Sequence, residues 1–240
     1  MIIGIYGYQD SGKTKLVEQL ASAMVKKGYS VASVKHTAGE WSLDQNGKDT
    51  WRHWKAGSDP VVFSSASETS IIVHSPTSLE DITGLLQREF NPDIIIIEGY
   101  KKGRFPKVAV GGIKPLSGTV MRNPDLSTLI RYVEREVKVE RALRSLPGLD
   151  CGKCGLDCEK LARAAVEGKR RLSACKELAH SHVRITIDGK RITTGRFVAE
   201  VADKTVRGML SSFKGYRHGK DVEIRLDVKK AGSKKVRKRR

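Results

Sequence analysis

The feature that most constrains this chain is a glycine-bounded phosphate-binding pattern, GxxxxGK[ST], at residues 7–14. It follows the apolar run at residues 2–6 and precedes apolar residues at helical spacing, Leu16, Leu20 and Met24. A strand, a glycine-rich turn and a helix in this order direct backbone N–H groups and a helix N-terminus at one point, which suits polyphosphate. The sequence therefore predicts a nucleoside triphosphate site.

The residues of this pattern have distinct expected roles. Lys13 would reach the β- and γ-phosphates, and the Thr14 hydroxyl would ligate Mg²⁺. Glu98 ends an apolar, β-branched run and would hold Mg²⁺ through water or orient the attacking water. Lys13 and Glu98 are therefore the predicted catalytic residues. The predicted nucleotide contacts of the loop and first helical turn are Gly7, Asp10, Ser11, Gly12, Lys13, Thr14 and Lys15.

Apolar strands that alternate with helical patterns predict an α/β fold with a mostly parallel sheet, a P-loop NTPase domain. Residues 36–59 are polar and dotted with glycine, and we expect a long functional connection there. Strands are predicted at residues 2–6, 29–35, 61–64, 71–74 and 93–98, and helices between the loop and Gly28, around residues 79–90 and around residues 126–143.

The charge distribution divides the chain. The formal net charge is +18, and most of the excess lies after residue 150. We expect a P-loop domain at residues 1–147, a small basic α+β domain at 148–228 and a disordered basic tail at 229–240. An acidic partner would suit the basic domain.

The second domain has its own predicted elements. Residues 183–187 and 191–193 flank Asp188-Gly189 and predict a hairpin, and residues 222–228 predict a final strand. An apolar stripe between residues 198 and 213 predicts a helix, with Phe197 and Phe213 expected in the core.

All four cysteines of the chain lie in one segment that opens the second domain: Cys151, Cys154, Cys158 and Cys175. Three close cysteines and a distant fourth suit a [4Fe–4S] cluster. Zn²⁺ is the alternative, although structural zinc sites more often pair two C-x₂-C units. The third interpretation is that the four cysteines bind no metal and are inert or redox-active thiols.

Several motifs together resemble the molybdopterin-guanine dinucleotide biosynthesis protein B (MobB) family. The resemblance covers roughly residues 1–145 and implies a GTP-binding, weakly GTP-hydrolysing adaptor, with a possible homodimer. Such an adaptor helps a nucleotidyltransferase attach guanosine monophosphate to molybdopterin. The motifs are residues 7–14, Lys35-His36-Thr37, residues 43–53, Ala56-Gly57, residues 97–101 and Pro106-Lys107.

Within this resemblance, the charged residues that follow the Lys-His-Thr motif are candidate nucleotide or pterin-phosphate contacts. They are Asp44, Lys48, Asp49 and Arg52. Arg52 can grip phosphate in bidentate fashion, and Lys48 can act as a point charge. A solvated polar loop is the competing interpretation.

The cysteine segment resembles a [4Fe–4S] domain of several electron-transfer and corrinoid proteins. In that pattern a Cys-Gly-x-Cys-Gly start is followed by an alanine-rich helix, a glycine and a last cysteine, as Cys151, Cys154, Gly168 and Cys175 stand here.

The expected partners follow from charge and resemblance. We expect GTP, molybdopterin, and a molybdopterin nucleotidyltransferase or molybdenum/tungsten apoenzyme with an acidic surface. No run approaches the roughly 20 apolar residues of a membrane span, so we expect a cytoplasmic protein. Aromatic residues that would stack on bases are sparse in the basic domain, which disfavours nucleic acid.

Three alternatives stay open at this point. The chain could be a nucleotide-gated iron–sulfur carrier or insertion factor, a P-loop small-molecule kinase, or a nucleic-acid binder held by its basic tail.

Overall fold

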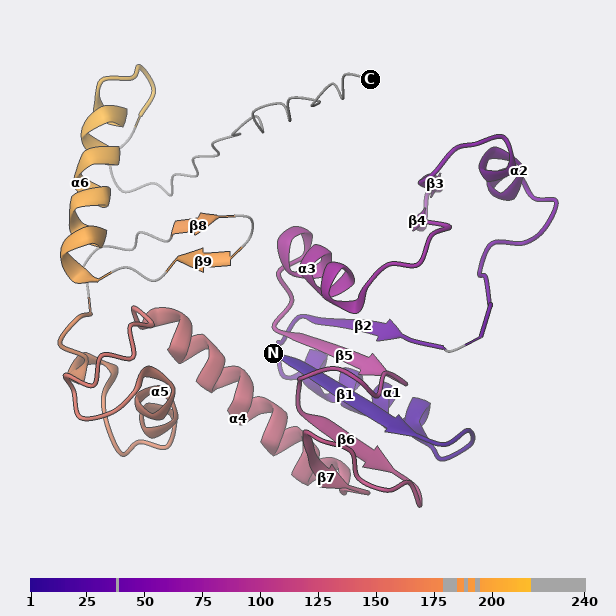
Figure 1. Ribbon diagram of the computed structural model, residues 1–240, viewed down its shortest axis with the longest axis horizontal. Coiled ribbons are helices and arrows are strands. Elements are labelled where there is room, and N and C mark those ends of the chain that lie inside the picture. The colour runs from indigo at the N-terminus through magenta and orange to yellow at the C-terminus, as the bar shows by residue number, and fades with distance from the viewer. Residues whose placement is uncertain (38, 179–184, 188–189, 193–194, 217–240) are drawn as a thin grey trace, which may run out of the picture.

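The computed structural model describes residues 1–37, 39–178, 185–187, 190–192 and 195–216. The strands of its main sheet are β1 (Ile2–Gly7), β2 (Val31–Lys35), β5 (Ile94–Glu98), β6 (Lys107–Val110) and β7 (Thr119–Arg122). In the described part of the chain they form one five-stranded parallel sheet in the order β2-β5-β1-β6-β7 (Figure 1). The predicted parallel α/β fold is therefore confirmed.

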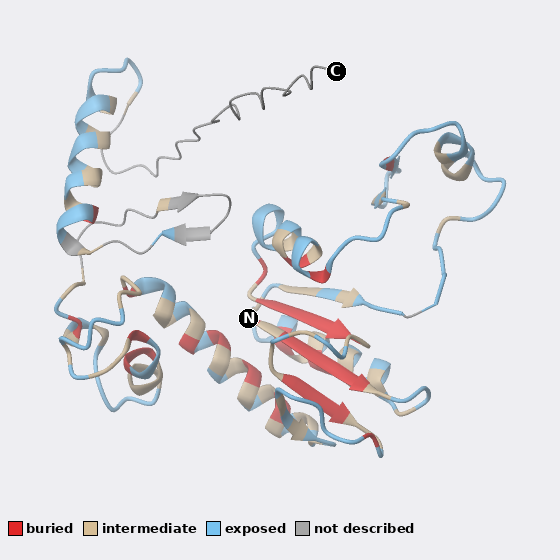
Figure 2. Cartoon of the chain, in the orientation of Figure 1, coloured by how far each residue is buried: buried red, intermediate tan, exposed pale blue. Residues whose placement is uncertain are grey.

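Helices cover both faces of this sheet. They are α1 (Lys13–Lys26), α3 (Leu79–Glu89) and α4 (Leu126–Ser145). Alternate residues of the central strands point to opposite faces: Ile96 packs in the core under α1 and α4, whereas Ile97 packs under α3. Figure 2 shows that burial concentrates on β1, β5 and β6. Because both faces are buried, β5 is a continuous apolar run, which is why the sequence predicted it well.

Two strands were not predicted. β6 opens with Lys107, which is buried and donates from Nζ to the carbonyl oxygen of Ser117 at 2.8 Å. β7 is a short edge strand with alternating exposure. β6 begins with a charged residue and both strands are short, so neither has a clear apolar period, although β6 pairs with β1 and β7 pairs with β6.

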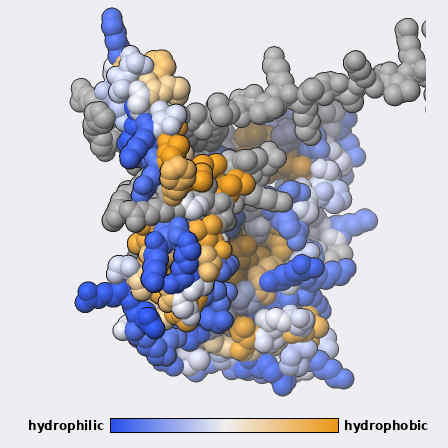
Figure 3. Space-filling view, turned by 60° about the vertical axis from the view of Figure 1, so that its left-hand side comes forward, coloured by the Kyte–Doolittle hydropathy of each residue, from blue (hydrophilic) through white to orange (hydrophobic). Residues whose placement is uncertain are grey.

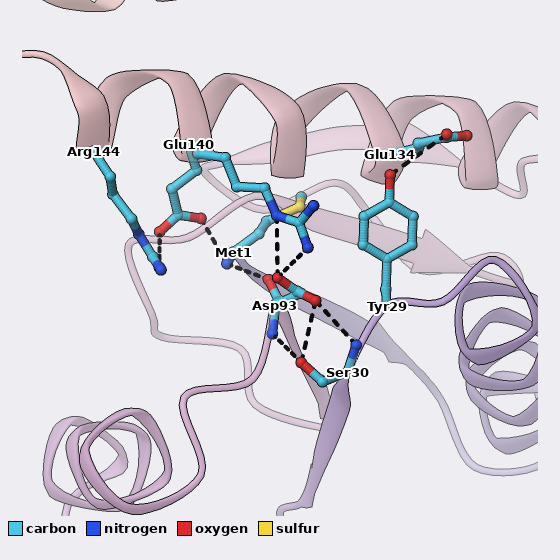
Figure 4. Close-up of polar contacts among 8 residues, drawn as sticks. Met1, Tyr29, Ser30, Asp93, Glu134, Glu140 and Arg144 are labelled. Carbon is cyan, nitrogen blue, oxygen red and sulfur yellow. Dashed lines mark hydrogen bonds and ion pairs between the residues drawn. The ribbon is translucent and has the colours of Figure 1, made fainter. Parts of the chain in front are cut away.

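The amino ends of the strands are tied together by the network in Figure 4. Asp93, just before β5, accepts from Arg141 Nε at 3.2 Å and Nη2 at 2.6 Å, and from the Ser30 backbone N–H at 3.0 Å. The Met1 amino group donates to the Asp93 carbonyl at 2.7 Å and pairs with Glu140 at 2.6 Å. Burial opposes ionisation of Asp93, but the bonds from Arg141 and Ser30 outweigh it and lower the pKa of this carboxyl.

Between β2 and α3 the chain leaves the sheet as an arm, residues 36–78. It contains α2 (Asp49–Lys55), β3 (Val61–Ser64) and β4 (Thr69–Ile72), of which β3 and β4 form an antiparallel hairpin. Figure 1 shows the arm standing away from the sheet, and Figure 2 shows that most of it is exposed. Within the long connection expected at residues 36–59, the sequence did not predict α2, which forms there without a buried residue.

The C-terminal elements begin beyond α4. They are α5 (Cys158–Val166), the 3-10 helix η1 (Leu172–Ala174), β8 (Ile185–Ile187), β9 (Lys190–Ile192) and α6 (Arg196–Ser211). β8 and β9 pair antiparallel, as the predicted hairpin requires. The predicted turn at 188–189, the strand at 222–228 and the tail at 229–240 lie outside the described residues.

The expectation that Phe197 and Phe213 are core residues is wrong. Phe197 is 77% exposed and Phe213 is 59% exposed, while Ala199 of α6 is buried. Figure 3 shows apolar side chains reaching the surface among hydrophilic ones on the face that carries the C-terminal elements. An apolar stripe indicates which side of a helix is apolar, but it does not show that another element covers that side.

Candidate nucleotide site and cysteine segment

The loop between β1 and α1, with the first turn of α1, is called the P-loop below (residues 7–14). It leaves the start of α1 open to a ligand. Gly12, the N-cap residue, has a φ of 86°, no described side chain caps this end, and the first turn contains no acidic residue. By contrast, Ser78, Asp125 and Asp157 cap α3, α4 and α5 with their own side chains. The first N–H groups of α1 therefore favour an anion.

Close packing fixes the P-loop against the end of β6. A Cβ on Gly7 would collide with the carbonyl oxygen of Val110, and one on Gly111 would lie 3.0 Å from the Ser11 Cβ. Asn123 holds Gly111 through its Oδ1, which accepts from the Gly111 N–H at 2.6 Å. The buried Ser11 hydroxyl has no hydrogen-bond partner among the described residues. The backbone at the end of β6 thus supports the P-loop and leaves no room for a side chain at Gly7.

The remaining P-loop residues are on the solvent side. Lys13 folds back and donates from Nζ to the carbonyl oxygen of Tyr8. Asp10 has a φ of 56° and is exposed, as is Lys15, the residue that follows the P-loop in α1. An ammonium held over the loop by a backbone carbonyl is free to exchange that neutral partner for a phosphate oxygen.

Glu98 lies beside the P-loop, as the sequence predicted for the acid that ends β5. Its residue is only 5% exposed. The Thr14 hydroxyl donates to Glu98 Oε1 at 3.0 Å, and the Lys35 ammonium forms an ion pair with the same oxygen. Because a buried carboxylate is costly unless it is paired, Lys35 and Thr14 are what make this position tenable for an acid.

The residue after Glu98 joins three chain segments. Gly99 has a φ of 91°, and a Cβ there would lie 2.5 Å from the carbonyl oxygen of His36. The Gly99 N–H donates to the Ile5 carbonyl at 2.9 Å, and the His36 N–H donates to the Glu98 carbonyl at 2.9 Å. The end of β1, the end of β5 and the base of the arm therefore meet at Glu98 and Gly99.

Asp44 belongs to the internal packing of the arm. Its Oδ1 accepts from the Thr50 hydroxyl at 2.6 Å, and its Oδ2 lies 3.3 Å from His74 Nε2. The His74 ring stacks on Trp54 with centroids 4.1 Å apart. These contacts connect the loop before α2, α2 itself and the segment after β4.

Lys48, Asp49 and Arg52 are on or next to α2. Lys48 is the N-cap residue of α2, and Arg52 Nη1 lies 3.8 Å from Asp49 Oδ1 in an exposed pair. Since the arm stands away from the sheet (Figure 1), the structure brings none of these three residues to the P-loop.

The four cysteines are free thiols in different environments. Cys151 is exposed, Cys154 is intermediate, and Cys158 and Cys175 are buried. Cys158 and Cys175 share an apolar cluster with Leu161, and Cys154 packs against this cluster. Burial raises the pKa of the Cys175 thiol, and Cys158, Cys154 and Cys151 add to the rise.

The cysteine arrangement fits a thiolate-bound metal group in donor chemistry. Within the described residues, however, no group of three or more His, Cys, Asp or Glu side chains is arranged to hold a metal ion. Lys153 and Glu177, next to the second and fourth cysteines, form an ion pair at 2.6 Å. Arg163 of α5 joins both carboxylate oxygens of Glu136 on α4 at 2.9 Å. The segment is thus a small apolar cluster packed against α4.

Sequence reasoning missed two residues of the site. Lys35 entered only as part of a family motif, and Asn123 was not singled out. The position of Lys35, the last residue of a predicted strand and next to His-Thr, was the available signal for it. For Asn123 the signal was the Asn-Pro pair directly after an edge strand.

Comparisons with known proteins bear on this site. The family model described as "Molybdopterin guanine dinucleotide synthesis protein B" (MobB) matches residues 2–132, and the model described as "Putative Fe-S cluster" matches residues 146–177. The first match contains the P-loop and Glu98, and it spans more than half of the chain.

This chain belongs to the MobB family. It is 30% identical over 239 residues to a Methanocaldococcus jannaschii protein named "Putative molybdopterin-guanine dinucleotide biosynthesis adapter protein", covering 95% of this chain and 98% of that protein.

Two further MobB relatives match about half of this chain. A Haemophilus influenzae "Molybdopterin-guanine dinucleotide biosynthesis adapter protein" is 32% identical over 109 residues, covering 45% of this chain and 61% of that protein. The crystal structure of Bacillus subtilis MobB is 23% identical with a TM-score of 0.45, covering 55% of this chain and 95% of that one. In the described part of this chain, no helix has the length and apolar character needed to cross a membrane.

Proposed function

We propose that this MobB chain binds GTP with Mg²⁺ at the P-loop and acts as an adaptor in the biosynthesis of molybdopterin guanine dinucleotide. The names of its relatives support the pathway, and the P-loop supports the nucleotide. Its hydrolysis of GTP is expected to be weak, and GTP binding serves mainly to control contact with a partner.

The observation that carries the proposal is the convergence of Thr14 and Glu98 at the uncapped start of α1. A hydroxyl and a carboxylate are the oxygen ligands that Mg²⁺ takes beside nucleotide phosphates. In this role Thr14 ligates the ion, Glu98 acts directly or through water, and Lys13 neutralises the terminal phosphates. The backbone N–H groups from Gly7 to Thr14 would surround the phosphates, with Asp10, Ser11 and Lys15 at the rim.

Weak turnover is expected because Arg52, a candidate for stabilising the transition state, is not at the P-loop. Arg52 is on the arm and pairs with Asp49. GTP hydrolysis is then expected to speed up only when a partner, or movement of the arm, adds a positive charge beside the γ-phosphate.

For the cysteine segment we propose a [4Fe–4S] cluster held by Cys151, Cys154, Cys158 and Cys175, with Zn²⁺ as the alternative. The family-model match at residues 146–177 supports it, and so does the apolar cluster that contains Cys158 and Cys175 with Cys154 packed against it. The cluster would supply one-electron chemistry or a structural link, and the thiolates would hold it. We place this group in a domain at residues 148–228, separate from the P-loop domain at 1–147.

The arm is the proposed contact surface for protein partners. Apolar side chains are exposed on it, which is unusual unless another surface covers them. Homodimerisation and docking of a molybdopterin nucleotidyltransferase are the two uses proposed for it. The exposed apolar residues are Trp41, Leu43, Val62, Phe63, Ile71 and Val73.

The adaptor role is tested by reconstitution. A molybdopterin nucleotidyltransferase, molybdopterin and Mg²⁺–GTP are combined with and without this chain, and guanine dinucleotide formation is measured. We expect the chain to raise the yield and Lys13→Ala to remove the effect. An unchanged yield, with the chain shown to bind GTP, would refute the adaptor role while leaving nucleotide binding intact.

An iron–sulfur carrier is a second candidate, favoured by one observation: Cys151 is exposed while Cys158 and Cys175 are buried. A cluster with one accessible ligand can be passed on. Transfer of a reconstituted cluster from this chain to an apo-enzyme, dependent on GTP, would support this candidate.

A further inference from the structure

Beside the P-loop, the carboxylate of Glu98 has two partners on the same oxygen atom. Both side chains engage Oε1 of Glu98, Thr14 as hydrogen-bond donor and Lys35 as ion-pair partner. Glu98 is buried, whereas the Lys35 side chain is 64% exposed. Of the two charged partners, Lys35 is therefore the one that can leave.

A second cation at this carboxylate competes with Lys35. If Glu98 and Thr14 take part in holding Mg²⁺, two positive charges would share one carboxylate oxygen, and like charges at that separation repel strongly. An ammonium on a flexible four-carbon stem can move a few ångströms at small cost. The nearest new partner of suitable charge would be the terminal phosphate of the nucleotide at the P-loop.

Lys35 is also where the arm begins. It is the last residue of β2, and the next residue, His36, donates its N–H to the Glu98 carbonyl at 2.9 Å. The His36 ring meets Tyr100 edge-on with centroids 4.9 Å apart. The next residue, Lys101, has its Nζ 6.0 Å from the ring centre of Tyr8 in the P-loop. A change of partner at Lys35 would therefore occur one residue before the backbone hydrogen bond that ties the arm to β5.

We propose that Lys35 is a positioning residue that couples occupancy of the P-loop to the conformation of the arm, by exchanging Glu98 for the nucleotide's terminal phosphate when Mg²⁺ and nucleotide bind. This inference rests on the proposed nucleotide binding, and it adds the residue through which binding is transmitted. In both states the buried Glu98 then has a positively charged partner. This partner is Lys35 before nucleotide binds and the metal ion afterwards.

The chain carries a built-in reporter for this coupling. All three of its tryptophans, Trp41, Trp51 and Trp54, lie in the arm. Trp54 stacks on His74, and Lys55 Nζ lies 4.1 Å from the Trp54 ring centre and 5.3 Å from that of Trp51. Intrinsic tryptophan fluorescence therefore reports on the arm and on no other part of the molecule.

The experiment titrates the full chain with Mg²⁺–GTP, and separately with GTP in EDTA, and follows binding by calorimetry and the arm by fluorescence. We expect Mg²⁺–GTP to change the fluorescence of the wild-type chain. In Lys35→Met, Mg²⁺–GTP should bind with lower affinity because one phosphate contact is lost, and at saturating nucleotide most of the fluorescence response should be lost because the link to the arm is broken. Lys35→Arg keeps the charge and should keep most of the response.

The matched control is Lys138→Met, which removes another exposed lysine that pairs with a glutamate, on α4 and away from the P-loop. It should respond as the wild type does. Circular dichroism checks folding, and Lys35→Gln replaces Lys35→Met if the latter does not fold.

The outcomes separate the two claims. A wild-type response that persists in Lys35→Met, or GTP binding without any fluorescence change in the wild type, overturns the coupling role alone. Loss of Mg²⁺–GTP binding in Lys35→Met also overturns it, because Lys35 would then be an obligatory ligand. Failure of the wild type to bind GTP at all refutes the nucleotide proposal and the coupling role with it.

Discussion

The hydroxyl of Thr14 donates to the carboxylate of Glu98 at 3.0 Å, although the two residues are 84 positions apart in the chain. Parallel pairing of β1 with β5 sets Ile5 opposite Glu98 and so brings the carboxyl ends of both strands to one point. The first turn of α1 then carries Thr14 to the same place. This pair is the centre of the proposed metal-nucleotide site.

Thr14→Val tests the metal part of that site. It keeps the shape of the side chain but removes the hydroxyl, so GTP affinity should fall about tenfold in Mg²⁺ and change little in EDTA, a loss typical of one metal ligand or charge-assisted hydrogen bond. Calorimetry in both buffers measures this. Thr205→Val, at an exposed position of α6, is the control. An equal loss in both buffers would mean that Thr14 supports the loop and not the metal.

Gly99→Ala tests the junction of β5 with the arm. The positive φ and the approach to the His36 carbonyl should destabilise the fold by about 1–3 kcal/mol. Gly84→Ala is the matched control, because Gly84 lies in α3 and the nearest atom to its added Cβ is Arg88 Nη1 at 3.9 Å. That change should stabilise by about 0.5–1 kcal/mol. Denaturant unfolding of the two variants should move in opposite directions, and a shift in the same direction would contradict the geometry.

Asp93→Asn tests the network at the amino ends of the strands. Its bonds to Arg141 and Ser30 should be worth about 2 kcal/mol at neutral pH, since the acceptor is charged and half-buried. Because the folded-state pKa of Asp93 is lowered, this stability is present above the ordinary pKa near 4 and is lost as pH falls through the lower, folded value.

The measurement for Asp93 is unfolding free energy against pH for the wild type and the variant. The two curves should differ at pH 7 and converge well below pH 4. Glu89→Gln, which removes an exposed pair with Arg88, should change stability by less than about 0.5 kcal/mol. A gap between wild type and Asp93→Asn that stays constant to low pH would show that the charge of Asp93 is not what stabilises the fold.

Cys175→Ser tests the proposed cluster. In an anaerobic preparation the wild-type chain should contain iron and sulfide and absorb visible light, and the variant should lose most of both, because the fourth ligand is missing. Ser173→Ala, in η1 and two residues away, should keep them. Zinc without iron in the wild type would assign the site to the alternative metal.

Helices, strands and loops could be predicted from the sequence where one short segment contains the whole pattern. The P-loop needs only its own glycines, Lys13 and Thr14, and β5 needs only its apolar run. α3 was predicted because its apolar residues repeat at helical spacing, and in the structure Ser78 caps it. These elements came out close to their observed bounds.

Features that depend on distant partners could not be read in this way. The Lys35 ion pair joins residues 63 positions apart, and nothing in the local sequence of either names the other. α2 has aromatic residues but no buried one, so it lacks the period of a packed helix. Phe197 and Phe213 have the spacing of a core face, but their exposure depends on what else packs there.

The central claim is that residues 7–14 bind a nucleoside triphosphate, and calorimetric titration of the folded full chain with Mg²⁺–GTP and Mg²⁺–ATP tests it most directly. We predict binding of GTP by the wild type and a loss of at least about 30-fold in Lys13→Ala, as expected when one partner of a desolvated charge pair is removed. Lys26→Ala, at the far end of α1, should bind as the wild type does. Uptake of neither nucleotide by folded protein, or equal GTP affinity in Lys13→Ala, would contradict the account.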